Sequence, residues 1–287
     1  MIRDRMLRFS GSKADVFDQM VGHFSFDDAS NVVFWDVFTG SGSVAEAVAR
    51  HFRNVRIVMN DFDQDLFALH HVVAQGSDHD FQTVLEMLDI TPTIERFREV
   101  LEWEPTAYTD RAFRAMFLNR TSDSRASGLR PLGGWKQNGD MRVHKRYRYH
   151  RFSARMLERR LLLKGRTMVT GDDFRVVLDA AAITPRSFIY CDPVYPEVGN
   201  KLYHNTPKWV DWDHVALRDK LLAMDNRWAL SYNDHSLIRF LYSGCEFHPV
   251  RMPKSSQGGE KIELLITPKE TLGWQEQEIP TGAKSSL

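Results

Sequence analysis

The residues with the clearest potential for chemistry are Asp192, Pro193 and Tyr195, which place a carboxylate, a rigid ring and an aromatic side chain within four positions. They come directly after the apolar run from Ser187 to Cys191, which predicts a buried strand. Ligands of open α/β sheets bind at the carboxyl ends of the strands. Asp192 and the Pro193 carbonyl could each accept a hydrogen bond from the exocyclic amine of a planar base, and Tyr195 could stack on it. Because Asp-Pro also begins ordinary turns, this interpretation depends on the rest of the chain.

A second candidate site lies upstream, where an apolar run from Asn31 leads into the turn Phe38-Thr39-Gly40-Ser41-Gly42 and then into a predicted helix from Val44. Glycines permit positive φ and a close approach of a ligand to the backbone. The next apolar run ends at Asn60-Asp61. An acidic residue about 20 positions after a glycine turn, at the end of the following strand, can hold ribose hydroxyls. The order of these pieces favours a nucleoside site, although each piece alone is also typical of a surface turn.

The glycine turn lacks the third glycine of the dinucleotide fingerprint, and the sequence has no Gly-Lys-Ser/Thr phosphate loop. A nucleoside cofactor without a pyrophosphate needs neither. S-adenosylmethionine is such a cofactor, with a ribose for Asp61 and an amino-acid tail for the turn.

At this point the chain resembles the D12 class of adenine-N6 DNA methyltransferases, the Dam-like group, in a form typical of phages or prophages. Asp192-Pro193-Val194-Tyr195 is similar to the family's Asp-Pro-Pro-Tyr motif, and Asp36 to Ser43 is similar to its Glu/Asp-Pro-Phe-x-Gly-x-Gly-Ser loop. The supporting stretches are Arg8 to Lys13 for the Trp-Ala-Gly-Gly-Lys element, Asn60 to Asp63 for the ribose element, Phe117 to Thr121 and Gly133 to Trp135 for target recognition, Asp173-Phe174 beside the cofactor adenine, and Ser231 to Asp234 and Glu263 to Thr267 for the closing strands.

The resemblance implies transfer of a methyl group from S-adenosylmethionine to N6 of an adenine that is flipped out of duplex DNA. It implies catalytic roles for Asp192, Pro193 and Tyr195. It implies cofactor contacts from Phe9, Lys13, Asp36, Phe38, Gly40, Gly42, Ser43, Asp61, Asp173 and Phe174.

Val194 stands where the family has a second proline. Because valine favours an extended backbone, we expect the loop to keep its shape and the chain to keep its activity. Two alternatives stay open: a weak or inactive DNA-binding protein with the methyltransferase fold, and an RNA adenine methyltransferase.

The net charge of zero conceals an asymmetry. Between Arg111 and Thr170 there are 16 Lys and Arg against three acidic residues, a balance of +13, and the rest of the chain balances it with −13. The densest part runs from Arg142 to Arg151, where tyrosines alternate with basic residues. This pattern suits contacts with phosphates and sugars of double-stranded DNA, and a solvated face is the alternative. The predicted DNA contacts are Arg120, Lys136, Lys145, Arg146 and Arg148.

These observations predict an α/β fold, a Rossmann-like methyltransferase sheet with an inserted, mostly helical target-recognition domain. The catalytic domain would comprise residues 1–62 and 166–270, the insert residues 63–165, and a polar, disordered tail residues 271–287. The expected strands after the insert are 167–170, 187–191, 228–231 and 261–267, and a helix is expected over 212–222 with Asp211 as its cap.

Two cysteines without paired metal-ligand spacing indicate a reducing compartment and no bound metal. The sequence has no apolar run of membrane-spanning length and a charged start unlike a signal peptide. We therefore expect a protein of the bacterial cytoplasm or of a phage-infected host, without a membrane partner, and a monomer or weak dimer.

Overall fold

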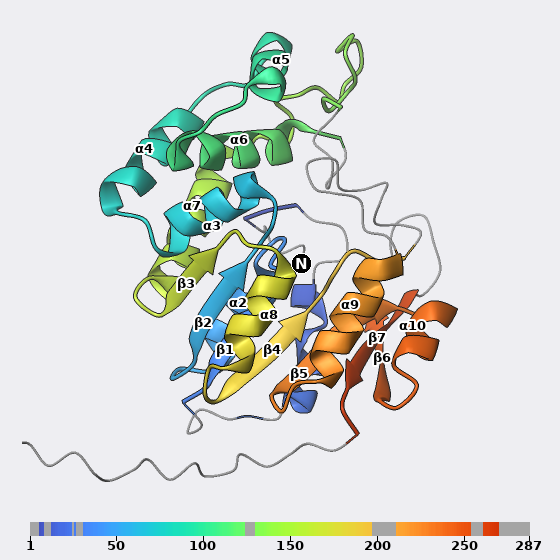
Figure 1. Ribbon diagram of the computed structural model, residues 1–287. Coiled ribbons are helices and arrows are strands. Elements are labelled where there is room, and N and C mark those ends of the chain that lie inside the picture. The colour runs from blue at the N-terminus through green and yellow to red at the C-terminus, as the bar shows by residue number, and fades with distance from the viewer. Residues whose placement is uncertain are drawn as a thin grey trace, which may run out of the picture.

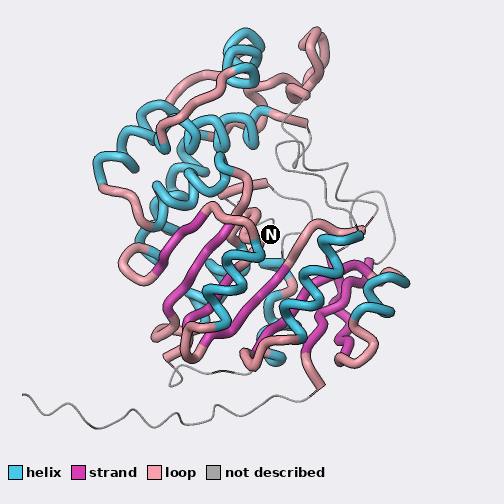
Figure 2. Tube along the Cα trace, viewed as in Figure 1, coloured by secondary structure: helices cyan, strands magenta, loops and turns pink. Residues whose placement is uncertain are grey.

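The computed structural model describes residues 6–8, 13–24, 26, 31–123, 130–196, 211–253 and 261–269. Phe9 and the tail from residue 271 lie outside these residues. A mixed sheet with helices on both faces forms one part of the described chain, and a group of helices stands beyond one end of the sheet (Figures 1 and 2).

The sheet has seven strands in the order β3-β2-β1-β4-β5-β7-β6. Their bounds are β1 Val33–Asp36, β2 Arg56–Asn60, β3 Thr167–Thr170, β4 Ser187–Cys191, β5 Arg227–Asn233, β6 Glu246–Met252 and β7 Lys261–Thr267. The pairs from β3 to β5 are parallel, and β7 runs antiparallel to both β5 and β6. This arrangement confirms the predicted Rossmann-like fold class.

The strand β6 was not predicted; it is an edge strand that carries Pro249 and alternates exposed and buried side chains only from Pro249 to Met252. Proline cannot donate to a sheet and is confined to edge strands. The other expected strands are present, and α9 (Asp211–Leu222) begins at Asp211 rather than one residue later.

Helices cover both faces of the sheet because the central parallel strands are buried on both sides. On one face, η1 (Lys13–Asp15), α1 (Phe17–Met20), η2 (Val21–His23) and α2 (Ser43–His51) lie against the side that Phe34 and Phe188 present. On the other face, α8 (Phe174–Ala182), α9 and α10 (Ser236–Leu241) lie against Trp35 and Ile189.

Residues 63–165 are mostly helical, as expected. They contain α3 (Gln64–Ala74), α4 (Asp78–Leu88), α5 (Ile94–Glu102), α6 (Tyr108–Thr121) and α7 (Tyr149–Leu163). These helices share a hydrophobic cluster of their own, which includes Leu69, Phe113 and Phe152. Two of them also reach the sheet domain, since α3 packs against β3 and α7 packs against α2.

The sheet order reverses between β1 and β4, which pair in parallel. The Val37 N–H donates to the Tyr190 carbonyl at 3.0 Å, so the loops after these two strands begin side by side. Ligands of open α/β sheets bind in the crevice at such a reversal. The two predicted motifs, Phe38 to Ser43 and Asp192 to Tyr195, are therefore neighbours in space.

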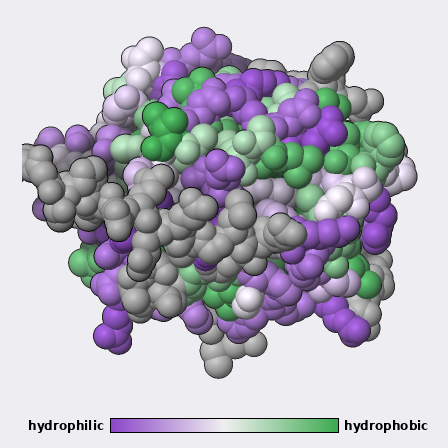
Figure 3. Space-filling view, turned by 60° about the horizontal axis from the view of Figure 1, so that its bottom comes forward, coloured by the Kyte–Doolittle hydropathy of each residue, from purple (hydrophilic) through white to green (hydrophobic). Residues whose placement is uncertain are grey.

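The lower side of the molecule, seen in Figure 3, intersperses hydrophobic residues among hydrophilic ones. Within the described ranges, every helix is too short or too polar to cross a bilayer.

Candidate active site

The half-buried Asp192 carboxylate is the centre of a polar cluster drawn from three distant parts of the chain. Lys13, the first residue of η1, places its Nζ 2.7 Å from Asp192 Oδ2 and 3.1 Å from Glu263 Oε2. The Tyr195 hydroxyl lies 2.9 Å from Asp192 Oδ1, 2.9 Å from Glu263 Oε2 and 3.0 Å from the Lys13 ammonium. Because a tyrosine hydroxyl has one proton, it donates to one carboxylate at a time.

Charges within the cluster set its protonation. Burial raises the pKa of Asp192, and the Lys13 ammonium opposes this rise. Burial alone would lower the pKa of Lys13, but the charges of Asp192 and Glu263 raise it above its usual value. Burial would raise the pKa of Glu263, but Lys13 and Lys261 hold it below its usual value. Lys13 is therefore a permanent cation that holds Asp192 in place.

Glu263 and Lys261 escaped sequence analysis as site residues. Glu263 is 1% exposed, and its Oε1 lies 2.6 Å from the Nζ of the exposed Lys261. The available signal was a carboxylate inside the apolar strand β7, because a fully buried glutamate is rare unless it is paired. Lys13, predicted as a cofactor contact, lies in the structure against the Asp192 carboxylate.

The glycine turn has the backbone that its sequence predicts. Gly40 and Gly42 have φ of 50° and 70°, values that favour glycine. The Gly42 N–H donates to the Thr39 carbonyl at 2.8 Å, and the Thr39 N–H donates to the Asn60 carbonyl at 2.8 Å. Ser43 follows as the first residue of α2. The turn is thus bound to the carboxyl end of β2.

Asp61 joins the turn directly, since its Oδ2 accepts from the Gly40 N–H at 2.7 Å and its Oδ1 from the Asp63 N–H at 3.0 Å. Burial, and then the charge of Asp63, raise the pKa of Asp61 to about 7. Each carboxylate oxygen has more than one acceptor site. Asp61 can therefore still accept from the hydroxyls of a ribose beside the turn.

Asp36 ends β1 with a side chain that is 2% exposed. Its Oδ2 has no hydrogen-bond partner among the described residues. Burial, and then the charge of Asp192, raise the pKa of Asp36 to about 8. A buried acceptor without a partner, next to a second carboxylate, is suited to a positively charged group of a ligand.

Aromatic side chains lie near the same loops. Phe38 in the turn has its ring centroid 5.7 Å from that of Phe174, the buried first residue of α8. Asp173 caps α8 by accepting from the Arg175 N–H at 2.9 Å. Phe62, which follows Asp61, is 43% exposed and was not among the predicted cofactor contacts. An adenine ring can use such apolar surfaces.

The basic segment, from Arg111 to Thr170, contains both exposed and buried basic side chains. Lys136, Lys145 and Arg148 are exposed, and Arg146 is half-buried. Arg120 is 5% exposed, donates to the Met6 carbonyl at 2.6 Å and lies over the Phe152 ring. The predicted DNA contact for Arg120 is therefore wrong for this structure, since its guanidinium is enclosed by packing between α6, α7 and the N-terminal segment.

The tyrosines of that segment pack on neighbouring side chains of the protein, whereas contacts with sugars were expected. The Tyr147 hydroxyl donates to the Leu88 carbonyl at 2.7 Å, and its ring contacts Phe117 and Phe152. Tyr149 packs edge-on against Phe152. Asn119 similarly binds the Arg8 backbone through two hydrogen bonds of 2.9 and 3.0 Å.

The sequence model of the D12 class N6 adenine-specific DNA methyltransferases matches residues 9–254. The chain belongs to this family. It is an adenine-specific DNA methyltransferase, and methyltransferases of this class generally use S-adenosylmethionine.

Type II methyltransferase M.CviBI of Paramecium bursaria Chlorella virus NC1A is similar to this chain, with 22% identity over 241 residues. That alignment covers 83% of the chain and 86% of the relative. The family match contains every predicted site residue of the methyltransferase from Phe9 to Tyr195 and ends before Glu263. The partner of Lys13 on β7 therefore emerges from the structure alone.

Proposed function

We propose that the methyltransferase transfers the methyl group of S-adenosylmethionine to N6 of an adenine turned out of duplex DNA. The observation that carries the proposal is the Asp192 carboxylate, held by Lys13 at the carboxyl end of β4 and adjacent to the glycine turn.

The residues around the turn fit S-adenosylmethionine. Asp61 would hold the ribose, and the partnerless oxygen of Asp36 would face the α-ammonium group of the amino-acid tail. The remaining predicted contacts are Phe38, Asp173 and Phe174 near the adenine, Gly40, Gly42 and Ser43 along the tail, and Phe9 and Lys13 from the N-terminal segment. When bound, the cofactor supplies an electrophilic methyl group.

Catalysis by the protein begins with the target amine, whose lone pair is delocalised into the ring. Hydrogen bonds from its two N–H groups to Asp192 and the Pro193 carbonyl favour a localised lone pair on N6. Positioning that nitrogen for attack on the methyl supplies most of the rate enhancement. Bound S-adenosylmethionine would supply the methyl group, its S–C bond breaking as the N–C bond forms, and Asp192 would accept one N6 proton.

The polar cluster allows Asp192 to accept a hydrogen bond from the adenine amine. Its two oxygens accept from Lys13 and Tyr195. Because the Tyr195 hydroxyl lies equally close to Glu263, it can donate there while the adenine amine takes its place at Oδ1. The Tyr195 ring then remains beside the site for stacking on the extruded base, which offsets part of the few kcal/mol that flipping costs.

The helices of residues 63–165 would form the target-recognition domain. The exposed Lys136, Lys145 and Arg148, with the half-buried Arg146, would neutralise phosphates of the duplex.

The proposal is tested by expressing the chain in cells without adenine methylation and sequencing their DNA by a method that detects N6-methyladenine. We expect methylation at a defined sequence, lost in Asp192→Ala and retained in Asp179→Ala, a control on the exposed surface of α8. Cofactor binding without methylation of DNA would refute the proposed transfer. Methylation of structured RNA alone would identify the RNA enzyme instead.

A further inference from the structure

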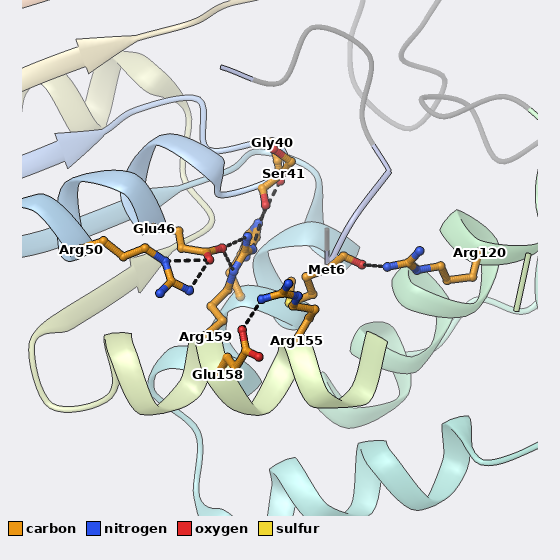
Figure 4. A network of polar contacts seen from close by, with 10 residues as sticks. Met6, Gly40, Ser41, Glu46, Arg50, Arg120, Arg155, Glu158 and Arg159 are labelled. Atoms are coloured by element: carbon orange, nitrogen blue, oxygen red, sulfur yellow. Dashed lines mark hydrogen bonds and ion pairs between the residues drawn. The ribbon is translucent and has the colours of Figure 1, made fainter. Parts of the chain in front are cut away.

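Two buried side chains from the helical segment, residues 63–165, hydrogen-bond to the backbone of the glycine turn. His70 on α3 contacts Gly40, and Arg159 on α7 contacts Ser41. Figure 4 shows the Arg159 contacts, with the guanidinium reaching from α7 to the turn and to the start of α2. Neither residue was predicted as a site residue from the sequence.

His70 is 1% exposed, and its Nε2 lies 2.9 Å from the Gly40 carbonyl oxygen. Because a carbonyl only accepts, Nε2 carries the hydrogen. Burial, and then the charge of Arg159, lower the pKa of His70 to about 3. The imidazole is therefore a neutral donor with a fixed tautomer at physiological pH.

Arg159 is 3% exposed and makes contacts on both sides of the turn's end. Its Nη1 donates to the Ser41 carbonyl at 2.8 Å. Its Nε and Nη2 donate to Glu46 Oε2 at 3.0 and 2.7 Å, and Glu46 lies in the first turn of α2. One guanidinium thus fixes the glycine turn relative to the helix that follows it.

The same two side chains also leave no room for a side chain at Gly42. A Cβ at Gly42 would lie 2.8 Å from Arg159 Nη1 and 3.0 Å from His70 Cε1, closer than side chains normally approach. His70 thus contacts Gly40, Arg159 contacts Ser41, and both side chains fill the space that a Cβ at Gly42 would need.

Fixing a carbonyl also fixes the neighbouring N–H. In a planar trans peptide the two groups point in opposite directions. When His70 draws the Gly40 carbonyl toward α3, the Ser41 N–H is directed away from α3. Without the two donors, the glycines could rotate these peptides, because positive and negative φ cost glycine about the same.

We propose that His70 and Arg159 are positioning residues, which hold the turn in the one backbone conformation that accepts the amino-acid tail of S-adenosylmethionine. The helical segment then completes the cofactor site in addition to any contact it makes with DNA. This inference rests on the function proposed above, because it requires that the turn bind the cofactor.

The test compares cofactor and DNA binding in matched variants. Arg159→Met and His70→Leu remove the donors. His70→Gln keeps a donor near the position of Nε2. Arg155→Met changes an arginine of the same helix that bonds Glu158 near the surface, and serves as the control (Figure 4).

We expect Arg159→Met and His70→Leu to raise the Kd and KM for S-adenosylmethionine about tenfold or more. Duplex affinity and kcat at saturating cofactor should stay within about twofold of the parent, a limit far below the loss of one strong hydrogen bond. His70→Gln and Arg155→Met should bind cofactor like the parent. Circular dichroism identifies a variant that fails to fold. If Arg159→Met does not fold, the comparison of His70→Leu with His70→Gln tests the inference, since leucine and glutamine both fill the buried space.

Parent-like cofactor affinity in Arg159→Met and His70→Leu would overturn this inference and leave the proposed function intact. Equal losses of cofactor binding, DNA binding and kcat in folded variants would also overturn it, because they indicate a general structural role. A parent that does not bind S-adenosylmethionine would overturn the proposed function and this inference together.

Discussion

Replacing Asp36 by asparagine should stabilise the folded protein while weakening its hold on the cofactor. The carboxyl is 2% exposed, its Oδ2 has no partner among the described residues, and Asp192 adds a repulsive charge. Asparagine has the shape of aspartate and keeps an oxygen that can accept the hydrogen bond from the Ala45 backbone N–H. It removes the ionisable group, and with it the carboxylate proposed to face the α-ammonium of the amino-acid tail.

The magnitude follows from the pKa, which burial raises from 3.8 to about 8. Between these values the folded state binds more protons than the unfolded state, so stability falls as pH rises. The loss is about 1.4 kcal/mol per pH unit, or roughly 5 kcal/mol at about pH 7.5. The buried amide of asparagine costs about 1–3 kcal/mol if its hydrogens find no partner. The net gain of Asp36→Asn is thus about 2–4 kcal/mol near neutral pH.

Urea unfolding of parent and variant at about pH 6 and pH 8 measures this gain, which should grow by about 2 kcal/mol across that interval. The packing cost of the amide is the same at both pH values, so the growth reports the carboxyl alone. Asp18→Asn, on the exposed side of α1, controls for the loss of one negative charge. Calorimetry should show weaker S-adenosylmethionine binding by Asp36→Asn. A gain that does not change with pH would refute the ionisation argument, and unchanged cofactor affinity would refute the binding role.

Three further outcomes are expected. Glu263→Gln should move the acid limb of the pH–rate profile to lower pH, because the Glu263 charge raises the pKa of Asp192. The limb marks the pH range in which Asp192 ionises and the rate rises. A limb that stays in place would exclude this coupling. Charge reversal of Lys145, Arg146 and Arg148 should weaken duplex binding and reduce the salt slope by about 0.9 for each phosphate that the variant no longer neutralises. An unchanged slope would identify these residues as a solvated face, and Arg56→Glu at the start of β2 is the control. Val194→Pro should keep or raise methylation, because proline at this position restricts the backbone of Pro193. If the parent is inactive and the variant active, Val194 silenced the enzyme. If the variant loses activity, the Val194 N–H is needed.

Local sequence determined the framework of this protein. Buried parallel strands must be apolar on both faces, so β1, β2 and β4 stand out as apolar runs. Positive φ is a local demand that glycine meets, so the turn at Gly40 and Gly42 was also visible. The order of strand, turn, helix, strand and acid then placed Asp61 beside the turn, because parallel strands end at the same edge of a sheet.

Tertiary structure decided which charged side chains act and which ones support the fold. Lys13, Asp192 and Glu263 are far apart in sequence and meet only because η1 packs where the carboxyl end of β4 and the amino end of β7 lie at the same edge of the sheet. Arg120 and Arg159 both belong to the basic segment, yet packing encloses both: one binds the N-terminal segment and the other the glycine turn. Composition gives the sign of a charge but not its exposure, since a guanidinium can be buried once carbonyls and carboxylates accept its hydrogens. Those partners come from other helices, and their positions depend on how the whole chain packs.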